Sequence, residues 1–88
     1  PSPRDRRMQS NPTLADLEPG ERAIVRDVSK QLPALERRRL IELGFYPGTP
    51  VLVALESPLG DPVAYQVRQM TVALRREQAR MIEVDRHA

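Results

Sequence analysis

A helix is expected to give way to a sheet within Arg37-Arg38-Arg39-Leu40-Ile41-Glu42-Leu43-Gly44-Phe45-Tyr46-Pro47-Gly48-Thr49. The residues up to Leu43 favour a helix, and Gly44 stands where a helix commonly ends in a left-handed residue. Pro47-Gly48 then supplies the fixed φ and the positive φ of a type II turn. Strand-forming residues follow at once, over residues 51–55. This hinge therefore divides a helical segment from a β segment.

Composition is that of a small globular domain. The chain has 88 residues, of which 40% are hydrophobic and 30% are charged, ordinary values for a folded protein of one domain. It contains no cysteine, which excludes disulfides and thiolate metal sites. No apolar run approaches the roughly 18 residues of a membrane span. We therefore expect a soluble, cytoplasmic domain.

Both ends of the chain are expected to lie outside the fold. Residues 1–12 are rich in Pro, Ser, Arg and Asn, and such a segment buries too little apolar surface to offset its ordering entropy, which predicts a disordered tail. The folded domain is expected over residues 13–85, with residues 86–88 as a frayed end. Leu14 and Leu17 are expected to anchor the start of the domain to its core.

One strand and one helix are predicted before the hinge. Residues 22–28 mix β-branched and polar side chains, as strands do. Ser29 is the expected cap of a helix over residues 33–43, since proline is tolerated in a helix's first turn. Apolar residues recur near helical spacing and predict a face packed on the sheet, formed by Leu32, Leu35, Leu40, Ile41 and Leu43.

After the hinge, residues 49–57 are predicted to form a strand. The alternation places Val51, Val53 and Leu55 on one face. The other face is also apolar, which indicates a strand buried in a barrel.

The remaining residues predict a hairpin and a last strand. Residues 63–67 and 70–74 alternate cleanly and are joined by Arg68-Gln69, the length of a tight hairpin turn. Gln69 lacks the positive-φ preference of such turns, so the turn type stays open. One helical turn is expected before a strand over residues 80–84. We therefore predict a mainly β fold: a small five-stranded barrel with one α-helix between strands 1 and 2 and a short helical turn before the last strand.

The connection over residues 57–62, Ser-Pro-Leu-Gly-Asp-Pro, is expected to be stiff and exposed because prolines flank it. Leu59 has no apolar partner nearby in the sequence. Its side chain either presents an exposed anchor to a partner or folds back to plug the end of the barrel, and the sequence leaves both interpretations open.

Together these segments resemble the FeoA family, which includes the ferrous iron transport proteins A and related C-terminal domains of metal-dependent repressors. The resemblance covers about residues 13–84 and implies an SH3-like barrel in the cytoplasm. It also implies a role in bacterial ferrous iron uptake together with FeoB, the membrane transporter that carries a G-protein domain. The motifs that carry it are Leu43-Gly44-Phe45-Tyr46-Pro47-Gly48, Ser57-Pro58-Leu59-Gly60-Asp61-Pro62 and Val72-Ala73-Leu74-Arg75-Arg76-Glu77.

Catalysis and metal binding are disfavoured by the residue types. The only histidine is His87 near the C-terminus, and no phosphate-binding loop of the Gly-x-x-x-x-Gly-Lys-Ser/Thr type is present. We therefore predict no catalytic residue, no cofactor and no metal ligand. The acidic residues Asp16, Glu18 and Glu21 lack the spacing of a calcium loop and are interpreted as a solvated turn. Aromatic residues are 3% of the chain, so nucleic acid is not an expected partner.

Protein–protein contact is the function that these observations leave. We expect Leu59 to be the apolar anchor and the arginines of the exposed helix face to supply complementary charge. The expected partner is FeoB, contacted from its cytoplasmic side, so that the membrane is reached only through the partner; weak self-association stays open. The expected partner-binding residues are Leu59, Gly60, Asp61, Pro62, Arg37 and Arg38.

Two other functions stay open at this point. The chain could be the detached C-terminal SH3-like domain of a metal-dependent transcriptional repressor, in which case a helix-turn-helix would lie upstream in its reading frame. It could instead be a small nucleic-acid-binding barrel, which predicts salt-sensitive retention on RNA.

Overall fold

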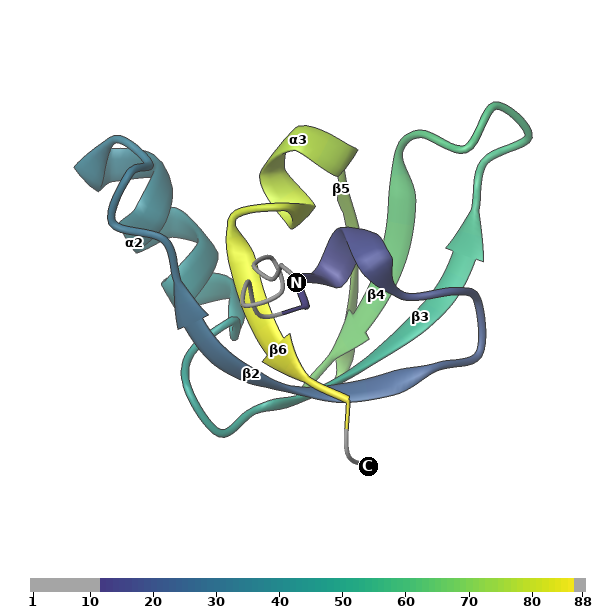
Figure 1. Cartoon of the computed structure of the whole chain (residues 1–88), viewed down its shortest axis with the longest axis horizontal. Helices are drawn as coiled ribbons and strands as arrows, with labels where there is room; N and C mark the ends of the chain where they lie inside the picture. Colours follow the sequence, from purple (N-terminus) through teal and green to yellow (C-terminus); the bar gives the residue numbers. More distant parts are fainter. Residues whose placement is uncertain (1–11, 87–88) are drawn as a thin grey trace, which may run out of the picture.

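A computed structural model describes residues 12–86, and in this part of the chain five antiparallel strands form one sheet (Figure 1). The sheet bends around one core without closing, because its strand order leaves two edges. The elements are η1 (Leu14–Asp16), β2 (Arg22–Val28), α2 (Ala34–Leu43), β3 (Pro50–Glu56), β4 (Val63–Val67), β5 (Met70–Leu74), α3 (Arg76–Ala79) and β6 (Ile82–Asp85). The sheet order is β5-β4-β3-β2-β6. The predicted mainly β architecture, with its helix after the first strand and its helical turn before the last, is confirmed.

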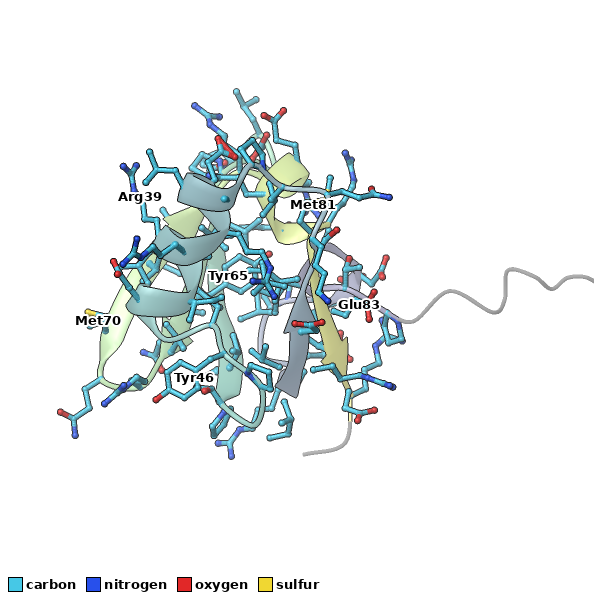
Figure 2. All side chains as sticks on the ribbon, turned by 90° about the vertical axis from the view of Figure 1, so that its left-hand side faces the viewer. Arg39, Tyr46, Tyr65, Met70, Met81 and Glu83 are labelled. Atoms are coloured by element: carbon cyan, nitrogen blue, oxygen red, sulfur yellow. The ribbon has the colours of Figure 1, made fainter. Side chains whose placement is uncertain are left out.

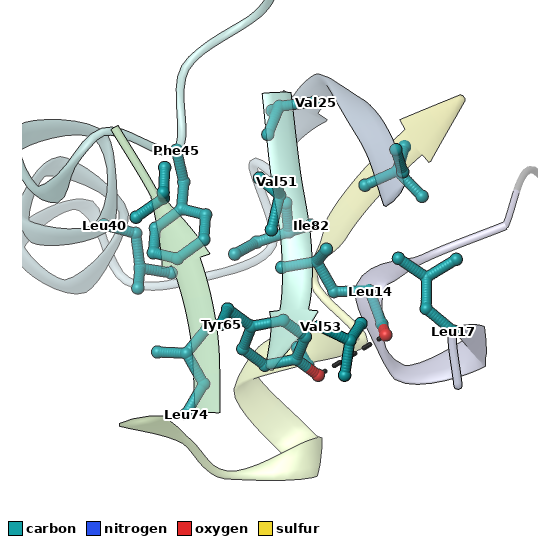
Figure 3. Packing of buried hydrophobic residues seen from close by; sticks show 14 of the residues in the cluster. Leu14, Leu17, Val25, Leu40, Phe45, Val51, Val53, Tyr65, Leu74 and Ile82 are labelled. Atoms are coloured by element: carbon teal, nitrogen blue, oxygen red, sulfur yellow. Dashed lines mark hydrogen bonds between the residues drawn. The ribbon is translucent and has the colours of Figure 1, made fainter. Parts of the chain in front are cut away.

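The core lies on the concave side of the sheet and is almost entirely apolar (Figure 3). Tyr65 of β4 crosses it, and its hydroxyl donates a hydrogen bond of 3.4 Å to the carbonyl oxygen of Leu14. Burial raises the pKa of Tyr65 above its usual 10.0, so the hydroxyl keeps its proton at neutral pH. Leu14 and Leu17 are both buried, which confirms that this first segment is anchored in the core.

Helix α2 ends as predicted but begins differently. Gly44, the residue that follows the end of the helix, has φ +122°, and the amide of Phe45 donates to the carbonyl of Leu40 at 3.1 Å. The residue preceding its first turn is Pro33, which caps no backbone amide through its side chain. Ser29, the expected cap, instead accepts a hydrogen bond from the amide of Gln31 at 3.0 Å in the connection before the helix. The prediction of a Ser29 cap was therefore wrong.

Two leucines predicted to be buried are exposed. Leu35 is 70% exposed, because at 100° per residue it lies about 140° around α2 from the buried Leu40. Leu55 is 69% exposed, because the β3–β4 register shifts between Val53 and Leu55 and so breaks the alternation of faces. The rest of the predicted α2 face, namely Leu32, Leu40, Ile41 and Leu43, does pack on the core.

The hairpin of β4 and β5 has the predicted boundaries, but Arg68 rather than Gln69 takes the unusual conformation. Arg68 has φ +60°, the only positive φ among the described non-glycine residues. A positive φ at the first position of a two-residue loop is typical of a type II′ turn, where glycine is usual. A charged residue therefore occupies a position that favours glycine.

The described ends belong to the fold more than predicted. The carbonyl of Pro12 accepts a hydrogen bond from the amide of Val84 at 2.9 Å. Arg86, expected to be frayed, donates from Nη2 to the carbonyl of Asp16 at 2.8 Å. Residues 1–11 of the expected 1–12 tail, and residues 87–88 of the expected 86–88 frayed end, including His87, lie outside the described residues.

Gly44→Ala should destabilise the fold more than Gly20→Ala. Both glycines have positive φ, which costs an alanine about 1–2 kcal/mol, but only at Gly44 would the new Cβ meet neighbours, 3.0 Å from Arg68 Cδ and 3.1 Å from Val67 Cγ2. Nothing lies within 4 Å of a Cβ at Gly20. Urea denaturation of both variants measures the difference, and an equal loss of unfolding free energy would show that the contact with the hairpin turn adds nothing.

Candidate docking site

The loop over residues 57–62 joins β3 to β4 and closes on its own first residue. The Ser57 carbonyl accepts from the amide of Gly60 at 2.8 Å, and Ser57 Oγ accepts from the amide of Asp61 at 2.9 Å. The amide of Ser57 donates to the carbonyl of Pro62 at 3.2 Å, and Gly60 takes φ +83°. The loop is therefore a closed turn with internal hydrogen bonds, which add to the stiffness that was expected from its two prolines.

Leu59 stands at the tip of this loop with 93% of its surface exposed. This exposure excludes the interpretation that Leu59 plugs the core. Leu55, at the end of β3 that leads into the loop, is exposed as well. This end of the β3–β4 pair therefore presents two leucines, of which the sequence pointed only to Leu59. The apolar character of both faces of β3 was the one signal that an exposed leucine was available there.

Arg76, at the start of α3, holds the loop in place although it lies 16 residues after Gly60 in the sequence. Its Nε donates to the carbonyl of Gly60 at 2.6 Å, and its backbone amide donates to Oδ1 of Asp61 at 3.0 Å. Its guanidinium also reaches the carbonyl of Ala15 at 3.2 Å and Oε2 of Glu56 at 3.0 Å. One side chain thus joins the loop, η1 and the end of β3. Arg76 lies in one of the motifs that carry the family resemblance, but its bracing role could not be predicted, because its partners are 15 to 61 residues away.

The predicted arginines lie elsewhere. In Figure 1, α2 and the 57–62 loop are at opposite ends of the longest axis of the molecule. Arg37 is half-buried: its Nε donates to the carbonyl of Val28 at 3.1 Å and its Nη2 lies 3.5 Å from Asp27 Oδ1. It is therefore a structural tie between α2 and β2, and the expectation that it belongs to an exposed helix face was wrong.

The other arginines of α2 do face solvent. Arg38 is exposed and lies 3.5 Å from Glu42, one turn along the helix. Arg39 points away from the fold (Figure 2). The structure brings Leu59, Gly60, Asp61 and Pro62 together in one loop and places Arg38 far from them. The compact candidate site consists of the loop and Leu55.

The acidic residues near the start of the fold have local partners. Asp16 Oδ2 accepts from the amide of Thr13 at 2.8 Å, and Glu21 Oε1 accepts from the amide of Glu18 at 2.7 Å. Within residues 12–86 no group of three or more His, Asp or Glu side chains is arranged to hold a metal ion. In the same range no helix is long and apolar enough to cross a membrane.

Comparison with known proteins gives one consistent family. The model of the FeoA domain matches residues 13–86. The chain is 38% identical over 72 residues to a fusion protein of Fe(2+) transport protein A and Fe(2+) transporter FeoB from Porphyromonas gingivalis. That match includes 82% of this chain and 8% of the fusion protein, so the chain corresponds to a small part of that polypeptide.

Solved structures agree with this match. The solution structure of FeoA from Chlorobium tepidum has a TM-score of 0.80 and 35% identity, covering 88% of this chain and 71% of that one. FeoA of Stenotrophomonas maltophilia complexed with zinc, described as an SH3 domain protein, has a TM-score of 0.76 and 34% identity, covering 84% and 89%. A manganese-dependent transcriptional repressor shares only the fold, at 19% identity and a TM-score of 0.73 over 44% of its length.

Replacing Arg76 with methionine should destabilise the chain by about 2 kcal/mol, the scale of lost hydrogen bonds to a charged donor. Little of this loss should come from the ion pair with Glu56, because side chains that are 32% and 36% exposed are screened by solvent. The matched control is Arg75→Met, whose guanidinium is 63% exposed and 4.0 Å from Asp61, and which should change stability by less than about 0.5 kcal/mol.

Urea denaturation measures both variants, and hydrogen exchange at the amides of Gly60 and Asp61 reports the loop directly. We expect faster exchange at both amides in Arg76→Met only. Equal exchange in the two variants would contradict the bracing role of Arg76.

Proposed function

The chain belongs to the FeoA family, and on that premise we propose that it is a cytoplasmic, non-enzymatic accessory protein of bacterial ferrous iron transport that contacts the FeoB transporter. The fusion protein of Porphyromonas gingivalis supports this partner, since FeoA and FeoB are joined there in one polypeptide. A covalent link raises the effective concentration of one module at the other, which favours modules that bind each other.

The exposed Leu59 on a braced loop is the observation that carries the proposal. An apolar anchor surrounded by polar groups is the usual centre of a protein–protein contact. Here the surrounding groups are Glu56, Asp61 and Arg75, all close to the loop. We name the loop over residues 57–62 together with Leu55 the docking loop.

Bracing also favours binding in energetic terms. A flexible loop loses conformational freedom when it docks, and that loss weakens binding. The hydrogen bond that Ser57 Oγ accepts from the Asp61 amide and the one that Arg76 donates to the Gly60 carbonyl already order the docking loop in the free protein. Metal transport and nucleotide chemistry would then belong to the partner, and this chain would act as a rigid contact module.

Leu59→Glu should weaken binding to the cytoplasmic G-domain region of the FeoB from the same organism by at least about tenfold, corresponding to about 1.4 kcal/mol. A carboxylate at the anchor would have to be desolvated without a partner. Isothermal titration calorimetry measures the affinity. The matched control is Leu35→Glu, which introduces the same charge at another exposed leucine, at the opposite end of the molecule.

Loss of binding in Leu59→Glu with retention in Leu35→Glu would support the docking loop. Equal affinity of wild type and Leu59→Glu, with both folded by circular dichroism, would remove this loop as the contact. A selective loss in Leu35→Glu would transfer the contact to α2.

A further inference from the structure

A second surface lies at the other end of the β3–β4 pair. A groove of about 340 Å³ opens on the face of the sheet that carries the exposed and half-buried side chains of β2 and β3. The register places Arg22 opposite Leu52 and Ile24 opposite Pro50. The volume is in the range of pockets that bind small ligands or single side chains. Residues that line it are Arg22, Ala23, Ile24, Thr49, Pro50, Val51, Leu52, Gln66 and Arg68.

The groove has an apolar floor and positive charge at its ends. Ile24, Pro50 and Leu52 supply apolar surface, and Arg22 and Arg68 are the only charged residues of the lining. Neither arginine has an acidic partner within residues 12–86. The acidic Asp85 lies opposite Ile24 on β6 and does not line the groove. The charged groups of the lining itself are therefore both positive, and Asp85 flanks the groove from β6.

Arg68 is held in place despite an unfavourable backbone conformation. Its φ of +60° suits glycine better than arginine. Its Nη1 donates to the hydroxyl of Tyr46 at 2.8 Å. Its Cδ and Cγ atoms pack closely on Gly44, since a Cβ added to that glycine would lie only 3.0 and 3.2 Å from them. Its guanidinium carbon also lies 5.9 Å from the centroid of the Tyr46 ring, and neither contact with Tyr46 pairs the guanidinium with a carboxylate. Strained residues are retained where the surrounding structure fixes them, and functional sites are a common place for them.

An unpaired polar group accompanies the two charges. Thr49, which also lines the groove, is 5% exposed, and its Oγ1 is buried without a hydrogen-bond partner among the described residues. Buried hydroxyls are normally paired. Because this hydroxyl is itself shielded from solvent, the charged groups that the groove offers at its surface are the two arginines.

We infer that this groove binds a short acidic peptide segment of a partner protein, with one apolar side chain on the floor and carboxylates at Arg22 and Arg68. Arginine is suited to this role because its fork of donors matches a carboxylate. A purely apolar ligand would leave both guanidiniums unpaired, and a basic one would be repelled. The site is separate from the docking loop, since the groove is lined by the start of β3 and the end of β4, and the loop over residues 57–62 joins the opposite ends of these two strands.

The probe is a fluorescein-labelled pentapeptide in which glutamate and leucine alternate, titrated into the full chain. We expect saturable binding that weakens as salt rises, because the contact is partly electrostatic. In ¹⁵N-labelled protein the shifted amides should include Ile24, Leu52 and Gln66. The same peptide with lysine in place of glutamate should not bind.

Arg22→Gln and Arg68→Gln should each weaken binding by about tenfold, as expected for the loss of one charge-assisted contact. Arg68→Gln keeps part of the stem that packs beside Gly44, and thermal melting checks that both variants fold. The matched control is Arg38→Gln, which removes the same charge from α2 and should leave the affinity unchanged. Leu59→Glu should also bind the peptide normally, so failure of this inference is distinguishable from failure of the docking loop.

Four outcomes of the peptide experiments would overturn the inference. These are absence of saturation at millimolar peptide, equal binding of the lysine peptide, equal affinity of the two groove variants and wild type, and amide shifts confined to residues 57–62. Tighter binding to phosphatidylglycerol vesicles, lost in the same two variants, would also overturn it, in favour of an anionic membrane surface.

Discussion

The candidate site depends on the hydrogen bonds and the ion pair that the side chain of Arg76 forms. This side chain joins the Gly60 carbonyl, the Ala15 carbonyl and the Glu56 carboxylate, which belong to three separate segments. The charge of Arg76 is partly screened by solvent. Its hydrogen bonds to the partly buried carbonyls of Gly60 and Ala15 therefore contribute more to stability than its ion pair with Glu56. The same side chain binds η1 through the Ala15 carbonyl and the 57–62 loop through the Gly60 carbonyl. The shape of the loop is therefore coupled to the stability of the whole domain.

The parts of the fold that follow from local chemistry were predictable from the sequence. The hairpin boundaries follow from alternation, and the end of α2 follows from Gly44. The parts that failed depend on contacts between distant residues. Leu55 turned outward because of a register shift against β4, and Arg37 turned inward because the Val28 carbonyl lies within its reach. No local pattern contains that information.

The candidate site shows the same division. The exposure and stiffness of the 57–62 loop could be read from its prolines and its isolated Leu59. The support of the loop by Arg76 could not be read from the sequence in this way. Of the 14 lysine and arginine residues all but Lys30 are arginines, and no local pattern shows which of them contacts the loop. The groove between Arg22 and Arg68 was also not visible, because its lining comes from three strands that only the register brings together.

The two proposed contact surfaces lie apart on this small domain. The docking loop stands at one end of the β3–β4 pair and the cationic groove at the other. The rigid sheet between them fixes their separation. A partner that engaged both would therefore be held in one orientation, and each surface would raise the effective concentration at the other.

Site-specific photo-crosslinking most directly tests the central claim, which is that the docking loop contacts FeoB. A benzoylphenylalanine at position 59, at position 35 or at position 24 would be irradiated in the presence of FeoB from the same organism, and the adducts would be mapped by mass spectrometry. The account predicts adducts with the cytoplasmic domain of FeoB from position 59 and none from position 35. Adducts from position 35 alone, or from no position, would contradict it.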